Sequence, residues 1–416
     1  MISWRYTFLG VMAVTVLGAM GCSSCRKQQR HDFDSSAPMA SFEVAPGRLF
    51  SPWFWEPTDA RDVALPAGCE FVGPPLRHRR STTNLFFFAS PGELHTLAMA
   101  QGDPNPDSVT ESRGLVTLSD KGAGAVRDVP WLHLTDPPLM TSSSQGWLAL
   151  LVESDGLGLA TRLWLWREAG AMELVAEGDR LQPIDAQCNQ NGCALLTTRV
   201  GQVATRGATA WLGQPMAPMA TWLRLEIPPD AVADASVPLG LVSWDASSHS
   251  ALIAFEDSDR ISFLRVTDTK VERQGSIERD YGIVDYLPMR DGPMVVTTWG
   301  EPDDIGCVPG GAFVQFTTLG KQAHRLRVAM LPSSGYARAL EHGALITWSA
   351  PMQCNLPNRK VVYAVLLHAD GAPASSIMAV GNADGHAVST SGNEVHLWLS
   401  DLVGVTWLRA KCRPPM

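Results

Sequence analysis

Charged residues are scarce in this sequence, and positive charge is not in excess. Asp, Glu, Lys and Arg make up 18% of the 416 residues, whereas hydrophobic residues make up 45%. This balance excludes an intrinsically disordered chain, because it provides enough apolar surface for a packed core. The formal net charge of -9 also provides no basic surface of the kind that holds nucleic acid. We therefore expect a folded body and no nucleic-acid partner.

Familiar signatures of catalysis are missing as well. The sequence contains no Gly-x-Ser-x-Gly elbow, no Walker loop, no dinucleotide-binding glycine fingerprint and no His-Glu-x-x-His motif. Long helical periodicity is also missing. We accordingly predict no catalytic residues, no cofactor and no metal site, and we favour a protein that is not an enzyme.

Two segments of the chain repeat one pattern about fifty residues apart. Met294–Trp299 and Ala344–Trp348 are each followed by a polar tip with a cysteine and then by an apolar strand. A repeat of this length is typical of a four-stranded propeller blade. Further paired strands are predicted at Leu85–Phe88 with Leu94–Met99, Trp147–Val152 with Arg162–Trp166, Ala251–Phe255 with Ile261–Val266, and Val395–Leu399 with Val403–Leu408.

The predicted fold is an all-β propeller over residues 69–416, closed by its N- and C-terminal segments. Turn formers are spread along the chain as 29 Pro and 36 Gly, and 14 Trp recur inside the predicted strands. The hairpin interval predicts seven blades, with six or eight as alternatives. The sequence resembles β-propellers as an architecture. It does not repeat the motif of any particular propeller family.

Residues 1–21 have the pattern of a signal peptide. Arg5 precedes an apolar run from Tyr6 to Met20, which is too short to span a bilayer. The run Leu17–Cys22 resembles a bacterial lipobox through Gly21 and Cys22. This resemblance implies that Cys22 is acylated, and Ser23 after it implies the outer membrane, with the face left open. The alternative is an exported protein without lipid, cleaved near the same point.

Two segments separate the lipobox from the predicted propeller. Residues 22–45 are mostly polar and predict a flexible tether. Residues 46–68 carry aromatic residues between prolines and predict an extended segment that covers the folded body. No stretch after residue 21 reaches the roughly eighteen apolar residues of a membrane helix. The predicted contact with the membrane is therefore the lipid anchor alone.

Export places the cysteines in an oxidising compartment. With Cys22 acylated and Cys25 in the tether, six cysteines remain, and six allow fifteen pairings. None of these six has the Cys-x-x-Cys spacing of a zinc site. Cys188 and Cys193 flank an Asn-Gly turn, which favours a bond between them. By their positions, the other predicted bonds are Cys307–Cys354 and Cys69–Cys412, the second of which would join the two ends of the propeller.

The predicted function is a membrane-anchored binding or scaffold lipoprotein that presents propeller loops to a protein or glycan partner. The alternative is a propeller-type enzyme that acts on cell-envelope glycans. Such an enzyme requires carboxylates that converge on one point, and the candidates are Asp245, Asp285 and Glu341.

The remaining conspicuous side chains are interpreted as structural. We predict that Trp299, Trp348 and Trp398 occupy equivalent core positions in successive repeats. The basic run Arg77–Arg80 is interpreted as a surface loop. Structural roles are also predicted for the histidines His342, His386 and His396 and for the acidic tips Glu256–Asp259 and Glu301–Asp304, in place of metal or calcium sites.

Overall fold

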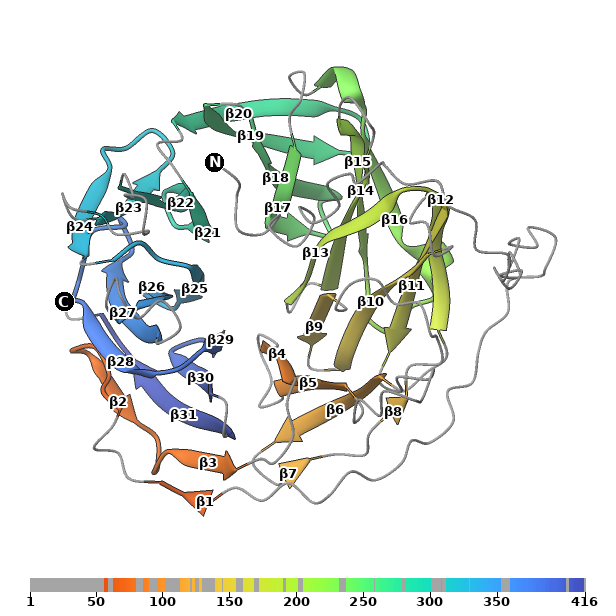
Figure 1. Ribbon diagram of the computed structural model, residues 1–416. Coiled ribbons are helices and arrows are strands. Elements are labelled where there is room, and N and C mark those ends of the chain that lie inside the picture. The colour runs from red at the N-terminus through yellow and green to blue at the C-terminus, as the bar shows by residue number, and fades with distance from the viewer. Residues whose placement is uncertain are drawn as a thin grey trace, which may run out of the picture.

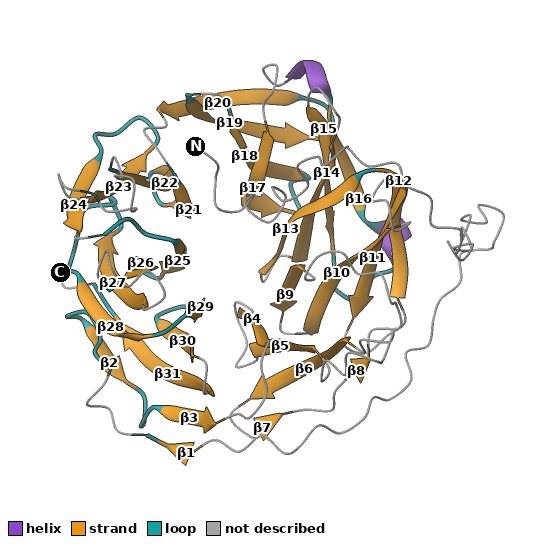
Figure 2. Cartoon of the chain, viewed as in Figure 1, coloured by secondary structure: helices purple, strands orange, loops and turns teal. Residues whose placement is uncertain are grey.

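The computed structural model describes residues 56–58, 63–79, 85–89, 96–101, 113–119, 122–123, 127–128, 139–143, 145–154, 160–167, 172–189, 192–200, 205–231, 237–257, 259–278, 282–300, 308, 312–328, 330–352, 360–401 and 404–414. Most of these residues lie in β-strands, and two short 3₁₀ helices, η2 (Met219–Thr221) and η3 (Pro229–Ala231), accompany them (Figure 2). Within the described residues, no helix is both long and apolar enough to cross a membrane.

Five consecutive sheets each consist of four antiparallel strands in chain order. The first two contain β9 (Leu139–Ser143), β10 (Gly146–Ser154), β11 (Ala160–Arg167) and β12 (Met172–Asp179), then β13 (Leu181–Asn189), β14 (Gly192–Val200), β15 (Thr205–Gly213) and β16 (Leu223–Ile227). The next contains β17 (Val237–Asp245), β18 (Ser250–Glu256), β19 (Arg260–Thr267) and β20 (Val271–Glu278). The last two contain β21 (Ile283–Met289), β22 (Gly292–Trp299), β23 (Ala312–Thr318) and β24 (His324–Val328), then β25 (Ser334–Leu340), β26 (Gly343–Pro351), β27 (Lys360–His368) and β28 (Met378–Asn382).

Two further sheets complete the described architecture. One contains β4 (Leu85–Ala89), β5 (Thr96–Gln101), β6 (Arg113–Ser119), β7 (Gly122–Ala123) and β8 (Arg127–Asp128). The other combines the two ends of the chain. It contains β1 (Glu56–Pro57), β2 (Cys69–Phe71) and β3 (Leu76–Arg79) with β29 (Gly385–Ser391), β30 (Glu394–Asp401) and β31 (Gly404–Cys412).

The sheets are arranged around a ring with the first strand of each nearest the centre, except that β29 is the inner strand and β1 the outer one in the sheet that combines the two chain ends (Figure 1). Each of these inner strands contacts the inner strand of the next sheet, and β29 contacts β4, so the ring is closed. This arrangement confirms the predicted all-β propeller. The number of blades stays a prediction, because the structure does not describe the side chains of β4–β8.

Strand β3 closes the ring as the outer strand of the last sheet. It pairs with β31 from Leu76 opposite Trp407 to Arg79 opposite Gly404. Arg77 donates from Nη2 to the Asp401 carboxylate (2.7 Å) and from Nη1 to Oγ1 of Thr406 (3.0 Å). The interpretation of the basic run Arg77–Arg80 as a surface loop is therefore wrong for Arg77–Arg79, and Arg80 lies outside the described residues. Through these contacts Arg77 joins β3 to the last sheet and provides a partner for the Asp401 carboxylate.

Two of the three predicted disulfides are confirmed. Cys69 on β2 lies opposite Cys412 on β31 with their Cα atoms 4.0 Å apart, and the bond joins residues 343 positions apart in the chain. Cys188 and Cys193 are opposed in the same way across the β13–β14 hairpin. The predicted Cys307–Cys354 bond lies outside the described residues, as do Cys22 and Cys25.

The apolar core is divided into layers between neighbouring sheets. One layer joins β21–β24 to β25–β28 through residues such as Val296, Phe316 and Trp348. Another joins β25–β28 to the last sheet, and includes Cys412 with Val362 and Leu397. Strands covered on both faces, such as β18, β22 and β26, are continuous apolar runs bounded by turns, whereas outer strands such as β20 and β24 carry exposed polar residues.

Two aspartates, the half-buried Asp185 and the buried Asp285, link the inner strands of neighbouring sheets. Asp185 on β13 accepts a hydrogen bond at Oδ2 from the Leu241 N–H on β17 (2.9 Å). Asp285 on β21 accepts one at Oδ2 from the Ala337 N–H on β25 (2.8 Å). Each aspartate follows a β-bulge in its strand. These side chains satisfy backbone donors between sheets where strand pairing does not.

Gly240 takes the corresponding place on β17, where a side chain would have no room. A Cβ at Gly240 would lie 1.5 Å from the hydroxyl oxygen of Tyr286. That hydroxyl lies 3.1 Å from Oδ2 of Asp185 and 3.1 Å from the Leu239 carbonyl. Tyr286 thus reaches from β21 past β17 to β13, and it connects three consecutive sheets near the centre of the ring.

Candidate functional site

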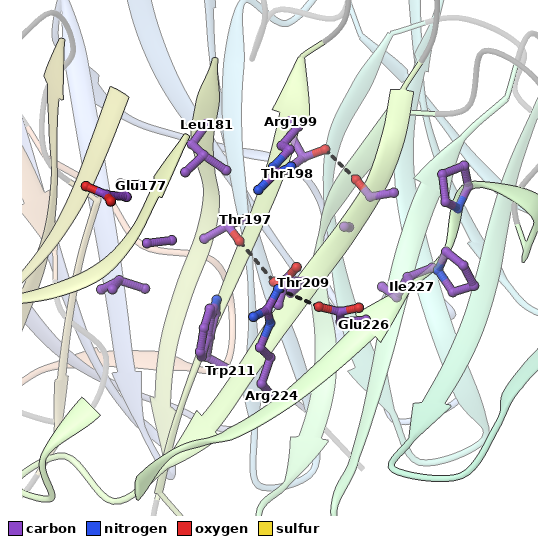
Figure 3. A pocket seen from close by; sticks show the side chains of 16 residues that line it. Glu177, Leu181, Thr197, Thr198, Arg199, Thr209, Trp211, Arg224, Glu226 and Ile227 are labelled. Atoms are coloured by element: carbon purple, nitrogen blue, oxygen red, sulfur yellow. Dashed lines mark hydrogen bonds and ion pairs between the residues drawn. The ribbon is translucent and has the colours of Figure 1, made fainter. Parts of the chain in front are cut away.

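A cavity of about 440 Å³ lies between the β9–β12 sheet and the β13–β16 sheet. Its floor is one face of β14, β15 and β16, and its side wall is β12 at Val175–Glu177. Figure 3 shows Arg199 and Thr198 at one end, Trp211 and Arg224 at the other, and Thr197 with Thr209 between them.

The floor of the cavity is polar where the packing of a propeller calls for apolar side chains. Strand register places Thr197, Thr209 and Glu226 in one row across the sheet, with Trp211 and Arg224 in a neighbouring row. The opposite face of the same sheet packs on β17–β20 through apolar residues such as Leu196, Ala210 and Leu225. Beyond the cavity, residues of the same sheet such as Cys193 and Leu195 join the apolar layer with β9–β12, and the partly buried Trp211 packs against that layer.

Hydrogen bonds and ion pairs fix most of the polar side chains on this face. The Thr197 hydroxyl donates to the Thr209 carbonyl (3.3 Å), and the Thr198 hydroxyl donates to the Gly207 carbonyl (2.8 Å). Arg224 forms an ion pair with Glu226, and its guanidinium lies 5.3 Å from the centre of the Trp211 ring. The floor therefore offers hydroxyl, carboxylate and guanidinium groups around one indole.

The loop between β15 and β16 positions the strand that carries Arg224 and Glu226. Arg167 on β11 is buried, and it donates from Nε to the Pro215 carbonyl (2.6 Å) and from Nη2 to the Ala217 carbonyl (2.7 Å). Arg167 also pairs with Glu173, whose Oε2 accepts from the Met219 N–H (2.6 Å). The neighbouring sheet thus holds both ends of this loop, which fixes where β16 begins.

The three carboxylates proposed for an enzyme have separate structural roles. Asp285 is 2% exposed and is hydrogen-bonded between β21 and β25. Asp245 accepts hydrogen bonds from the Ser247 hydroxyl and N–H at the surface, and these lower its pKa. Glu341 accepts a hydrogen bond at Oε2 from Nδ2 of Asn393 (2.6 Å). None of these contacts joins one of the three carboxylates to another.

The three histidines also lie in separate surroundings. His342 is exposed beside Glu341, and His386 is buried on β29. His396 accepts a hydrogen bond at Nδ1 from the Trp407 indole (3.2 Å) and stacks near Trp398. Within the described part of the chain, no group of three or more His, Cys, Asp or Glu residues is arranged to hold a metal ion.

The prediction of three equivalent core tryptophans is wrong for one of them. Trp348 and Trp398 are each 1% exposed, whereas Trp299 is 39% exposed and lies against Phe313 with ring centres 5.6 Å apart. Strand β22 ends at Trp299, whereas β26 continues past Trp348 to Pro351. Trp299 therefore lies at the end of its sheet, beyond the layer that buries the other two.

The acidic tips belong to ordinary turns where they are described. Oδ2 of Asp257 accepts a hydrogen bond from the Ser262 hydroxyl (2.6 Å) and lies 3.9 Å from Nη2 of Arg273. This agrees with a structural role for the tip after β18. The second acidic tip, Glu301–Asp304, lies outside the described residues.

His386 is expected to make the protein less stable in mild acid. Its Nε2 lies 3.1 Å from the Thr347 hydroxyl, and burial, followed by the charges of Arg338 and Lys360, lowers its pKa to about 3. The unfolded chain takes up a proton near pH 6.5 and the folded chain does not, so stability is full above pH 6.5 and falls below it. We expect a loss of about 2 kcal/mol from this residue between pH 7.5 and pH 5.

Denaturant unfolding at both pH values measures this effect. The His386→Gln variant keeps a polar partner for Thr347 but does not titrate, so its stability should fall by about 2 kcal/mol less than that of the wild type. Equal losses in the two proteins would show that His386 takes up its proton in the folded state.

The sequence did not single out the cavity residues, although one signal for them was present. Arg224 and Glu226 alternate with Leu223, Leu225 and Ile227, a pattern of period two. Such alternation indicates a strand with one solvated face, and the outer strand β24 shows it as well. Combined with the predicted fold, it would have marked one face of β16 as open.

Comparisons with known proteins give no family. No protein-family model matches the sequence. No curated protein matches it either. Among solved structures, the chain is similar to the β-propeller domain of the Trilobed protease from Pyrococcus furiosus, which has an open velcro topology. That similarity has 11% identity, covers 78% of this chain and 93% of that one, and has a TM-score of 0.47.

Two other solved structures are comparably distant. One is Pyrococcus horikoshii acylaminoacyl peptidase, with 9% identity and a TM-score of 0.45, covering 78% of this chain and 51% of that one. The chain thus spans about half the length of that peptidase. The other is the N10 neuraminidase-like protein of a bat influenza virus, with 9% identity and a TM-score of 0.40, covering 83% and 100% of the two chains. These similarities carry no argument about function.

Proposed function

We propose that this protein is a lipid-anchored protein of the cell envelope that binds a glycan in the cavity between the β9–β12 and β13–β16 sheets. The observation that carries the proposal is the polar face of β14–β16, which borders an open volume where neighbouring sheets otherwise pack through apolar side chains. An unfilled interface of this kind costs packing energy, which a bound ligand would recover.

The size and chemistry of the cavity favour a saccharide. About 440 Å³ falls within the range of pockets that hold small ligands, roughly 300–1,000 Å³. Thr209, Arg224 and Glu226 supply donors and acceptors for several hydroxyl groups. Trp211 and the Pro228–Pro229 rim supply flat apolar surface for the C–H face of a sugar ring. A protein partner, the other expectation from the sequence, would require a broader apolar centre.

Binding of envelope oligosaccharides to the full-length protein tests the proposal. Isothermal titration is expected to detect binding to the detergent-solubilised protein. The double variant Arg224→Ala with Glu226→Ala should weaken it about tenfold or more, because each lost hydrogen bond to a charged group contributes about 1.5–3 kcal/mol. Both side chains are more than half exposed, so the fold should tolerate the change.

The control removes a matched pair from another outer strand. Lys270, just before β20, and Glu272 on β20 form an exposed ion pair with the same spacing in sequence. Replacing both by alanine should leave the affinity unchanged. If the Arg224 and Glu226 variant binds as tightly as the wild type, or if no oligosaccharide binds, the cavity is not a glycan site.

The lipid anchor is supported by the lipobox resemblance at Gly21–Cys22. Acylation of Cys22 would hold the propeller at a membrane through the segment that precedes β1. Cys22→Ala is expected to move the protein from the membrane fraction to the soluble envelope or extracellular fraction. Cys25→Ala is the matched control and should stay with membranes. A Cys22→Ala protein that remains in membranes contradicts the anchor.

A further inference from the structure

Ion pairs engage three of the four charged side chains that line the cavity. Glu177 on the wall lies 3.5 Å from Nε of Arg162, and Glu226 on the floor is paired with Arg224. The fourth, Arg199 at the end of β14, forms no ion pair within the described part of the chain. Among the described lining residues, its guanidinium is therefore the charge that these pairs leave available to a ligand.

The backbone of β12 holds the Arg199 side chain at the end of the cavity. A Cβ at Gly178 would meet Nη2 of Arg199 at 3.4 Å, so the guanidinium rests where residue 178 has no side chain. Figure 3 shows Arg199 at the end of the cavity opposite Trp211 and Arg224. An arginine stays charged at any physiological pH, and its planar fork matches the two oxygens of a carboxylate. The end of the cavity is thus suited to one anionic group.

The neighbouring hydroxyls lie at a useful spacing from this guanidinium. Thr197 precedes Arg199 by two residues on β14, a step of about 6.6 Å along the strand and comparable with the size of one sugar ring. Thr209 lies opposite Thr197, and its own hydroxyl is still available to a ligand. A carboxylate on Arg199 would therefore place the remaining hydroxyls of the same sugar over the two threonines.

We infer that the cavity takes an acidic saccharide, a sugar residue whose carboxylate pairs with Arg199 and whose hydroxyls meet Thr197 and Thr209. This inference rests on the proposed function and adds the class of sugar. The paired glutamates strengthen it, because their own arginines neutralise them and they do not repel an incoming anion.

The test compares a uronic-acid oligosaccharide with the same oligosaccharide after reduction of its carboxyl groups to alcohols. The wild-type protein should bind the acidic form about tenfold or more tightly, and added salt should narrow the difference. Arg199→Gln should remove this preference and leave the affinity for the reduced form unchanged. Arg265→Gln, at an exposed arginine on β19, should keep the preference.

The possible outcomes separate this inference from the proposed function. The assignment of an acidic sugar would be overturned if the wild type bound both forms with equal affinity. It would also be overturned if Arg199→Gln lowered the affinity for both forms equally. Glycan binding itself would stand in either case. Binding of neither form would overturn both. Arg199 is exposed and forms no ion pair with a described residue, so the Arg199→Gln variant is expected to fold. A circular dichroism spectrum like that of the wild type verifies this.

Discussion

Removal of the Cys69–Cys412 disulfide is expected to lower the free energy of unfolding by up to about 5 kcal/mol. The bond joins two directly opposed residues of β2 and β31 that are 343 positions apart in the chain. Chain entropy makes a cross-link over so long a loop stabilising, because the unfolded chain loses many conformations when its ends are joined. The bond also fixes the edge of β31 at which the ring closes.

The second disulfide provides the matched control. Cys188 and Cys193 are opposed in the same geometry but only 5 positions apart, so chain entropy gives this bond about 2 kcal/mol. Guanidinium unfolding of the double variants Cys69→Ala with Cys412→Ala and Cys188→Ala with Cys193→Ala measures both effects. A loss at Cys188 and Cys193 that equals or exceeds the loss at Cys69 and Cys412 would contradict the role of ring closure.

Asp285→Ala is expected to lower the free energy of unfolding by about 3 kcal/mol. The carboxylate accepts hydrogen bonds from the N–H groups of Tyr286 (3.0 Å) and Ala337 (2.8 Å) and from the Arg338 guanidinium (3.1 Å). The Asp285 side chain is 3% exposed and that of Arg338 is 27% exposed. Removal of the Asp285 carboxylate leaves the buried N–H groups of Tyr286 and Ala337, and the partly buried charge of Arg338, without this partner.

Asp291 on the turn after β21 provides the comparison for Asp285. It pairs with Lys321 at the surface, where both side chains are about 40% exposed. Solvent screens exposed pairs of this kind, so Asp291→Ala should change the unfolding free energy much less than Asp285→Ala does. Denaturant titration of both variants gives the difference. Equal effects would show that Asp285 does not hold β21 to β25.

The strand pairs are the part of this fold that the sequence predicts well. Four of the predicted pairs, those beginning at Leu85, Trp147, Ala251 and Val395, form in the structure as β4–β5, β10–β11, β18–β19 and β30–β31. Each partner is nearby in the chain, and each strand is an apolar run bounded by turn residues. The two confirmed disulfides were predictable for a related reason. Cys188 and Cys193 flank a tight turn, and Cys69 and Cys412 lie at the two ends of the repeats, so each position restricts the choice of partner.

The features that the sequence did not reveal depend on distant partners. Leu76–Arg79 looks like a basic loop because the strand that pairs with it begins only at Gly404. The need for glycine at position 240 comes from the Tyr286 hydroxyl on another sheet. In the cavity, the alternation around Arg224 is ordinary for a sheet with one solvated face. The alternation points to a site only once the structure shows β9–β12 and the cavity beside that face.

The pairing of β3 with β31 also sets the order in which the protein can be completed during its synthesis. Residues 76–79 leave the ribosome long before residues 404–412, yet their native hydrogen-bond partners lie on that last strand. Contacts over such a separation form late, because the entropy of a long loop is lost before the contact stabilises it. Each intervening sheet can pack against the sheet that precedes it in the chain, which has already been synthesised. The first strands to be translated are therefore among the last to find their places, and a chain that stalls before Gly404 keeps its N-terminal edge unpaired.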